Sequence, residues 1–328
     1  TYMVPPGGTT TQSNRGRAVF AGGYEGPSPA AGTKTIDYFN IQSGGITQSF
    51  GTLSEDRKFS AGLASATRGV FGGSDGTPSW ATGTMEYVTI ATTSNTTTFG
   101  NMTQVGGMVS AHSNNTRGLF FSVWDANTSG SSHKRHIDYI TIATAANSQD
   151  FGELTVQRPE AAGFGSSTRG ICAGGYQALS PFGALNTIDY VTIATLGDAT
   201  DFGDTTQARF AVGGASSQTR GVIAGGIVSP SYLNTIDYVT IATTGDATDF
   251  GDLTTTPAGI FVGNCSDQIR GIFAGGRTSG GDAMINTVQY VTIATTGNAQ
   301  DFGDMTRNSD GEGAVYGSVC SDSHGGIS

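Results

Sequence analysis

Closely spaced carboxylates are the residues of this chain whose spacing first suggests chemistry. Three Asp residues fall within seven positions at Asp198–Asp204 and again at Asp246–Asp252, and Asn298–Asp304 repeats the string with Asn in first place. Carboxylate oxygens bind Ca²⁺, which takes about six to eight oxygen ligands. The string lacks the alternating ligands and bidentate Glu of an EF-hand, and Ser49 and Thr98 replace the middle Asp in other copies. We therefore favour turn formation over calcium binding, with the middle Asp paired to a repeated Arg.

Histidine and cysteine show no pattern typical of a catalytic centre or a metal site. None of the histidines has a Cys or Asp at metal-ligand spacing, and the cysteines lack the paired spacing of a disulfide framework. Cys265 and Cys320 occupy equivalent places in VGNCSD and YGSVCSD, so we expect both to be small buried side chains. We predict no enzyme activity, no cofactor and no metal. The histidines are His112, His133, His136 and His324, and the third cysteine is Cys172.

These residues belong to a unit that recurs six times. Each unit has an Arg-Gly, an apolar run that usually ends in Gly-Gly, a Tyr strand and a Phe-Gly turn, with 12 residues from Tyr to Phe. A period near 50 residues with several short strands per unit is typical of radial or stacked β architectures. The repeated Arg is at 17, 68, 117, 169, 220 and 270, the Tyr at 38, 87, 139, 190, 238 and 290, and the Phe at 50, 99, 151, 202, 250 and 302.

Each unit is expected to form four strands. RGVIAGG, NTIDYVTIAT and ATDFGDLT are three of them in the fifth copy, and a segment such as RFAVGGASSQT, which leads into the next Arg-Gly, is the fourth. Gly-Asp turns lie between strands at 197–198 in the fourth copy and at 245–246 in the fifth. The chain enters at Arg17–Gly23 on a second strand, and the missing first strand matches Gly311–Asp322. We therefore predict an all-β fold, a six-bladed β-propeller of four-stranded antiparallel blades over 15–328, closed by pairing the N- and C-terminal segments. Residues 1–14 are expected to be a tail or linker, and a linear β-solenoid is the rival architecture.

The Arg, the Gly-Gly, the Tyr strand and the following aromatic residue resemble the kelch repeat, whose proteins form β-propellers. The chain departs from that pattern by placing Phe where kelch blades commonly have Trp. Its third copy has FFSVW at Phe120–Trp124 in place of Gly-Gly, so we expect that blade to be distorted. Some kelch propellers are copper oxidases, but no copper site of Tyr, His and Cys can be placed on these positions. Glu160 and Glu312 could meet a substrate in the central channel, or equally be solvated strand ends.

Length variation is concentrated after the Gly-Gly. Four of the five full Phe-to-Arg intervals are 18 residues, whereas Arg-to-Tyr intervals vary from 18 to 22. The kelch resemblance implies that the variable connection lies on the same face as the links between blades. Its aromatic residues could stack on sugars or anchor a protein partner, or each could cover the end of its own blade. We predict a ligand- or partner-binding set of Tyr24, Trp80, Trp124, Tyr176, Phe182, Tyr232 and Arg277.

Composition limits the classes of partner. The net charge of −10 argues against nucleic acid, and no apolar stretch approaches the roughly 18 residues of a membrane span. Units such as TIDYVTIATTGDATDFGDLT also resemble kelch-like proteins of phages, cyanophages in particular, which implies a tail-fibre or surface protein of the virion, assembled in the host cytoplasm. The expected partners are a host surface glycan or protein and other virion proteins. The alternatives are a purely architectural virion protein and a cellular kelch adaptor.

Overall fold

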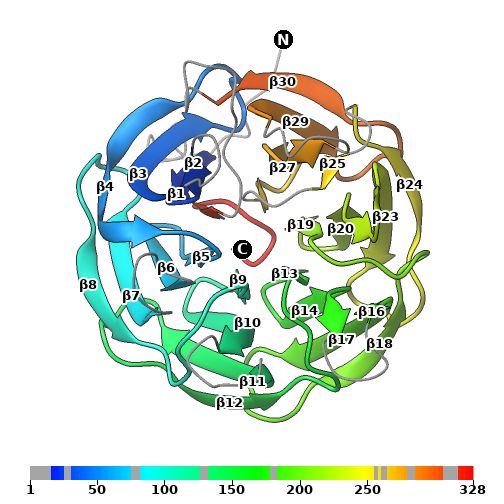
Figure 1. Cartoon of the computed structure of the whole chain (residues 1–328), viewed down its shortest axis with the longest axis horizontal. Helices are drawn as coiled ribbons and strands as arrows, with labels where there is room; N and C mark the ends of the chain where they lie inside the picture. Colours follow the sequence, from blue (N-terminus) through cyan, green and yellow to red (C-terminus); the bar gives the residue numbers. More distant parts are fainter. Residues whose placement is uncertain are drawn as a thin grey trace, which may run out of the picture.

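The structure, a computed structural model, describes residues 16–25, 31–74, 82–125, 132–177, 183–254, 258–259, 264–278, 285–305 and 317–327. Over these residues the chain forms strands and no helix, so it has no helix that could cross a membrane there. Figure 1 shows the strands as blades around a central axis, with the C-terminus near the centre. The predicted tail at 1–14 lies outside the described residues.

Six blades of four antiparallel strands make up the ring, and the strands of each blade follow one another from the centre outward. Blade 1 is β31 (Ser318–Ser321), β1 (Arg17–Ala21), β3 (Ala31–Asn40) and β4 (Gln48–Arg57). Blade 2 is β5 (Ala61–Ala64), β6 (Arg68–Ser74), β7 (Thr82–Thr89) and β8 (Thr97–Asn101). Blade 3 is β9 (Ser110–Ser113), β10 (Arg117–Asp125), β11 (Ser132–Thr141) and β12 (Gln149–Glu153).

The second half of the ring repeats this order. Blade 4 is β13 (Ala162–Gly165), β14 (Arg169–Ala173), β17 (Thr187–Thr192) and β18 (Thr200–Asp204). Blade 5 is β19 (Gly213–Ser216), β20 (Arg220–Ala224), β23 (Thr235–Thr240) and β24 (Thr248–Asp252). Blade 6 is β26 (Asn264–Ser266), β27 (Arg270–Ala274), β29 (Thr287–Thr292) and β30 (Gln300–Asp304). Short pairs extend several blades: β2 (Tyr24–Glu25) on β3, β15 (Tyr176–Gln177) with β16 (Gly183–Ala184), β21 (Ile227–Val228) with β22 (Ser231–Tyr232), and β25 (Ala258–Gly259) with β28 (Arg277–Thr278).

The ring is closed by the C-terminal strand. β31 pairs with β1, and Ala18 lies opposite Ser321 while Ala21 lies opposite Ser318. The Asp322 carboxylate accepts hydrogen bonds from the backbone N–H groups of Gly16 and Arg17, at 2.7 and 3.0 Å. In blade 6 the Asp267 carboxylate, within a continuous turn, accepts the same bonds from the N–H groups of the next strand. The predicted fold and closure are confirmed, and the interrupted turn is completed without a covalent connection.

The hydrophobic core lies between neighbouring blades, because each sheet is covered on both faces. One cluster joins Ala18, Phe20 and Phe39 of blade 1 to Ile272 of blade 6. The next joins Val19, Ala21 and Ile36 of blade 1 to Phe71 and Val88 of blade 2. Burying one such apolar side chain contributes about 1.5–3 kcal/mol, so every seam between blades is a substantial source of stability.

The repeated Arg stacks on the Tyr of its own blade and bonds to the next blade. The Arg220 guanidinium lies 4.4 Å from the centre of the Tyr238 ring, and its Nη1 donates to the carbonyls of Ile293 and Ala294. The Phe250 ring meets the same Tyr edge-on at 6.1 Å. The other five blades repeat the cation–π contact at 4.2–4.9 Å. The predicted pairing of Arg with the middle Asp is therefore wrong, because the guanidinium is already occupied and Asp201 is exposed on the outermost strand.

The first Asp or Asn of the repeated string joins adjacent blades. Asp246 of blade 5 accepts the backbone N–H of Asp204 in blade 4 at 3.0 Å, and Asn298 of blade 6 does the same for Asp252. The Phe-Gly glycine allows this approach: a Cβ on Gly251 would lie 2.6 Å from the carbonyl of Gly297. The string therefore forms the turns that we favoured, and its repetition follows from the repeated seam.

Blade 3 keeps four strands despite losing Gly-Gly. Ser122 occupies the place of the first of the two glycines with a left-handed φ of +55°, and the pairing of β10 with β11 shifts between Phe121 and Val123. Its hydroxyl donates to the carbonyl of Lys134 at 2.8 Å, which compensates part of the cost of that backbone conformation. The expected distortion is thus a bulge.

Candidate functional site

The candidate binding residues lie on one side of the ring, which we call the loop face. It bears the connections between second and third strands and the links between blades; the opposite turn face bears the other hairpins. Four of the seven candidates share one position, seven residues after the repeated Arg of their blade: Tyr24, Trp124, Tyr176 and Arg277. For Tyr24 and Arg277 only the backbone is described, and Trp80 and Phe182 lie outside the described residues.

The three candidates with described side chains are half-buried. Trp124 pairs through its backbone with Gly107, on the link that enters blade 3. The Tyr176 ring packs edge-on against Phe210 at 5.2 Å. Tyr232 lies opposite Ile227 in the β21–β22 hairpin. Each side chain therefore covers part of its blade and leaves part of its surface accessible, so the two interpretations of these aromatic residues are compatible.

Four left-handed residues form a hydrogen-bonded arc where the links enter the innermost strands. They are Phe59, Met108, Glu160 and Ala211, with φ between +56° and +60°. Met108 N–H donates to the Phe59 carbonyl at 2.8 Å, Glu160 N–H to the Met108 carbonyl at 3.3 Å, and Ala211 N–H to the Glu160 carbonyl at 2.9 Å. The arc follows blades 2 to 5 around the channel mouth. Such a conformation costs a side-chain-bearing residue about 1–2 kcal/mol, so this part of the mouth is strained.

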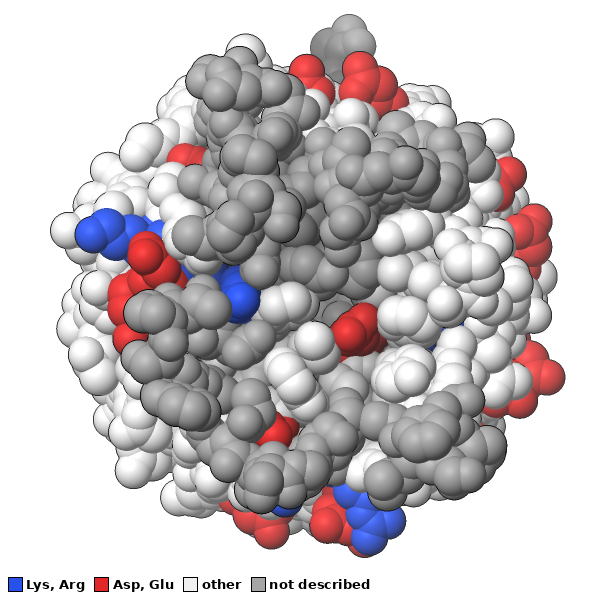
Figure 2. Space-filling view, viewed as in Figure 1, with Lys and Arg blue, Asp and Glu red and all other residues white. Residues whose placement is uncertain are grey.

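Glu160 is the acidic member of this arc. Burial raises its pKa to about 7. Within the described ranges its carboxylate has no hydrogen bond or ion pair. Glu160 lies on the link just before β13 (Ala162–Gly165). Figure 2 shows acidic side chains around the rim of the ring and an acidic group near its centre. The sequence left Glu160 open between a channel residue and a solvated strand end and did not predict that its carboxylate lacks a partner. Glu312, for which the same two possibilities were open, lies outside the described residues.

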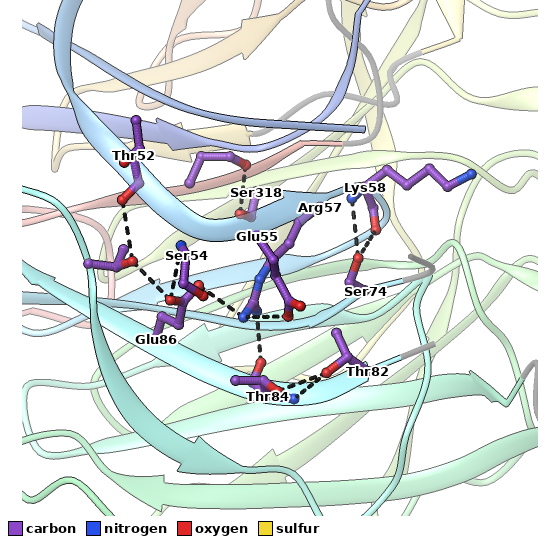
Figure 3. A network of polar contacts seen from close by, with 12 residues as sticks. Thr52, Ser54, Glu55, Arg57, Lys58, Ser74, Thr82, Thr84, Glu86 and Ser318 are labelled. Atoms are coloured by element: carbon purple, nitrogen blue, oxygen red, sulfur yellow. Dashed lines mark hydrogen bonds and ion pairs between the residues drawn. The ribbon is translucent and has the colours of Figure 1, made fainter. Parts of the chain in front are cut away.

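Buried ion pairs fix three of the links on the next blade. Arg158 and Arg209 pair with Asp189 and Asp237 through contacts of 2.5 and 2.7 Å, and all four side chains are fully buried. Figure 3 shows the corresponding contact between Arg57 and Glu86, at 2.9 Å. Each Arg also donates to a carbonyl of the next blade. Sequence reasoning missed these pairs.

The same site in blade 6 shows what signal could have found them. Pro257 stands seven residues after Phe250, where Arg209 stands after Phe202. Gln289 then replaces the acidic residue and accepts the Thr254 N–H and hydroxyl, both at 2.7 Å. In this seam the Arg and the carboxylate are lost together. The seam before blade 3 differs, because Gly106 stands in place of Arg while Asp138 remains and accepts hydrogen bonds from Thr103 and Ser148.

The channel is narrow and its turn-face end is filled by the C-terminal segment. The innermost strands enclose a cavity of about 50 Å³, room for a few water molecules. His324 bonds through Nε2 to the Ala64 carbonyl at 2.9 Å and lies 5.7 Å, ring to ring, from His112. Gln268 donates to the carbonyls of His324 and Ile327. Burial lowers the pKa of His112 to about 3 and that of His324 to about 4.

The cysteine side chains lie in the interior. Burial raises the pKa of all three cysteine thiols, which are buried and free, as expected for Cys265 and Cys320. No three His, Cys, Asp or Glu side chains gather as a metal site in the described part of the chain. No protein-family model and no curated protein matches this sequence. The structure shows six blades of four antiparallel strands, a fold that is consistent with a kelch-like propeller.

Proposed function

We propose that this chain is a non-catalytic structural and binding component of a phage virion, a tail fibre or surface protein whose loop face contacts a host surface glycan or protein. The observation that supports this most is the placement of large aromatic side chains on one face of an otherwise uniform ring. Trp124, Tyr176 and Tyr232 are all on the loop face and only half-buried. Aromatic side chains of this kind bind sugars and anchor protein partners.

The links beneath these residues are suited to presenting a fixed surface. The buried pair of Arg209 with Asp237 holds one link, and the pair of Arg158 with Asp189 holds another. A rigid scaffold with individual loops is a common arrangement for binding sites. Binding through such a face needs no conformational change of the propeller.

The test is binding of the labelled, purified protein to intact bacterial cells of a host strain, before and after removal of surface polysaccharide. We expect saturable binding that is lost on stripping, and lost with Trp124→Ala or Tyr232→Ala at unchanged melting temperature. Leu196→Ala is the matched control, because Leu196 is 55% exposed on the turn face. Absence of binding by the folded protein would favour a purely architectural role, and in that case Trp124→Ala should reduce incorporation into particles instead.

A further inference from the structure

The Glu160 carboxylate has no polar partner in the part of the chain that the structure describes. The other buried acidic side chains of the seams are engaged: Asp237 accepts bonds from Arg209 and Thr206, and Asp189 from Arg158 and Thr155. Glu160 makes no such bond within the described residues, although it is half-buried. An unpaired carboxylate in such a place destabilises the protein when ionised, so its retention in the strained arc is unexplained by folding.

Two of the half-buried aromatic residues are connected to the backbone on either side of Glu160. The Tyr176 N–H donates to the carbonyl of Pro159, the residue before Glu160, at 3.0 Å. Trp124 pairs with Gly107, next to the Met108 whose carbonyl accepts the Glu160 N–H. The backbone segments that bear Trp124 of blade 3 and Tyr176 of blade 4 therefore adjoin the link that bears Glu160, one on each side. Carboxylates flanked by aromatic side chains are suited to organic cations, which gain both charge pairing and cation–π attraction.

The positive groups on neighbouring links do not neutralise this carboxylate. Arg158 on its own link is bound to Asp189, and Arg209 on the next link is bound to Asp237. Arg57 is bound to Glu86, and the Lys58 ammonium lies 5.8 Å from the centre of the Phe59 ring. A positive charge for Glu160 must therefore come from outside the described chain.

We propose that the channel mouth binds an organic cation, a primary ammonium or guanidinium group, through Glu160 between Trp124 and Tyr176. The inference builds on the proposed binding role of the loop face and names the chemistry that one part of it recognises. The group could belong to a Lys or Arg of a partner protein or to an amino sugar. Lys and the amino sugar present an ammonium group to the carboxylate, and Arg presents a guanidinium.

The test uses two cationic probes and their neutral N-acetylated forms. Nα-acetyl-lysine methylamide represents a protein source, and methyl 6-amino-6-deoxyglucoside represents a sugar source; binding is followed by Trp fluorescence or calorimetry. At pH 8 we expect the cationic forms to bind and the acetylated forms not to bind. Because only the ionised carboxylate pairs with the cation, the affinity should fall about 30-fold between pH 8 and pH 5.5. Whichever probe binds more tightly identifies the source.

Variants separate this role from a structural one. Glu160→Gln should abolish both binding and its pH dependence, yet raise the melting temperature at pH 8, because it removes a buried charge. Glu160→Ala is a second variant that should fold, since Ala211 already occupies the equivalent position with φ +56°. Asp201→Asn, an exposed change of the same charge on blade 4, should leave binding unchanged.

The outcomes are distinguishable from those of the cell-binding experiment. A Glu160→Gln protein that is less stable at pH 8, or equal binding of acetylated probes, would overturn the proposal. If the protein binds the cationic probes but does not attach to host cells, the cation site is supported and the proposed attachment role is contradicted. Cell attachment by the Glu160→Gln protein at wild-type affinity would retain attachment and reject the cation site as its basis.

Discussion

The turn face and the loop face of this propeller are built from the same strands but use their residues differently. On the turn face, polar groups are paired: Asp322 completes the interrupted turn and His324 bonds to Ala64 inside the channel. On the loop face, Glu160 has no polar partner among the described residues and a left-handed backbone, and Trp124 is half-buried. The difference indicates that closure of the ring depends on the turn face, whereas the loop face retains strain and accessible surface that binding could use.

The largest expected effect comes from removing the segment that closes the ring. A chain ending at Thr306 lacks β31, whose four residues are all buried, and the plug that follows it. β1 would then expose an unpaired edge, and neighbouring apolar clusters would lose Val319 and Cys320. We expect loss of cooperative thermal unfolding, measured by circular dichroism. A truncated chain that melts as cooperatively and as high as the full chain would show that closure does not stabilise the ring.

Breaking a buried pair beneath the loop face should have the next largest effect. Arg209→Met leaves the Asp237 carboxylate buried without its cation, which typically costs about 3–5 kcal/mol of unfolding free energy. Adding Asp237→Gln recreates the neutral arrangement of Gln289 in blade 6 and should restore most of that loss. Urea denaturation of the two single variants and the double variant measures the coupling. Additive losses would show that the two residues act independently.

Acid should affect the turn face through the two histidines of the channel. The folded pKa of His324 is about 4 and that of His112 about 3, both below the ordinary value of 6.5. The unfolded chain therefore binds more protons between these values and pH 6.5, so stability is full above pH 6.5 and falls as the pH decreases. For His324 the loss is roughly 3 kcal/mol. His324→Gln should flatten the stability–pH curve between pH 6.5 and 4.

The loop face should respond to pH with the opposite sign. The pKa of Glu160 is raised to about 7 in the folded chain, above its unfolded value. The folded state then binds more protons between the ordinary Glu pKa and pH 7, so this residue lowers stability as the pH rises through 7. Measuring the free energy of unfolding of wild type, Glu160→Gln and His324→Gln across pH separates the contributions of the two ends of the channel.

A close contact between blades supplies a smaller, sterically defined effect. Gly251 has φ +145°, and a Cβ there would lie 2.6 Å from backbone atoms of Gly297; Gly245 has φ +154° and no atom within 4 Å of its Cβ position. Gly251→Ala should therefore cost about 1–3 kcal/mol more than Gly245→Ala, because the backbone of the next blade must move. If the two substitutions destabilise the protein equally in thermal denaturation, Gly251 is required for its backbone conformation alone and not for the close contact between blades.

The sequence predicts the scaffold well because its causes recur in every unit. Strand periodicity, the Gly-Gly and the complementary ends led to six blades and to closure by β31, all of which the structure has. The repeated Arg was assigned the wrong partner, because spacing shows that Arg and Asp recur together but not which group faces the guanidinium. Tyr238, 18 residues away along the chain, lies directly beneath Arg220.

The candidate site was less predictable because its determinants do not recur. The pair of Arg209 with Asp237 joins residues 28 positions apart in different blades, and only three of the six units have it among the described contacts. Glu160 differs from Met108 and Ala211 at the same backbone position, and nothing local to the sequence shows that the position is left-handed or that its side chain lacks a partner. Whether a charged side chain has a partner depends on residues that are far away in the sequence and close in the fold.

The smallest expected effect tests whether the strain of the loop face is a requirement of the backbone or of function. Ala211 has the left-handed conformation without a charged side chain, so Ala211→Gly relieves the strain, about 1–2 kcal/mol. The change also removes a buried methyl group and makes the unfolded chain more flexible, but a buried alanine with ordinary backbone loses as much on replacement by Gly. Ala211→Gly should therefore be about 1–2 kcal/mol more favourable than the same change at such an alanine.

Chemical denaturation of Ala211→Gly beside Ala162→Gly measures this, because Ala162 is a buried strand residue that should lose stability on the same change. A gain in stability for Ala211→Gly relative to Ala162→Gly, with unchanged cation binding, would show that the backbone path of the link imposes the left-handed turn. In that case Glu160 alone adds the binding function. A gain accompanied by weaker cation binding would show that the hydrogen bond from Ala211 to the Glu160 carbonyl requires a rigid neighbour to position the carboxylate. The loop face would then retain its strain because that strain orients the binding group.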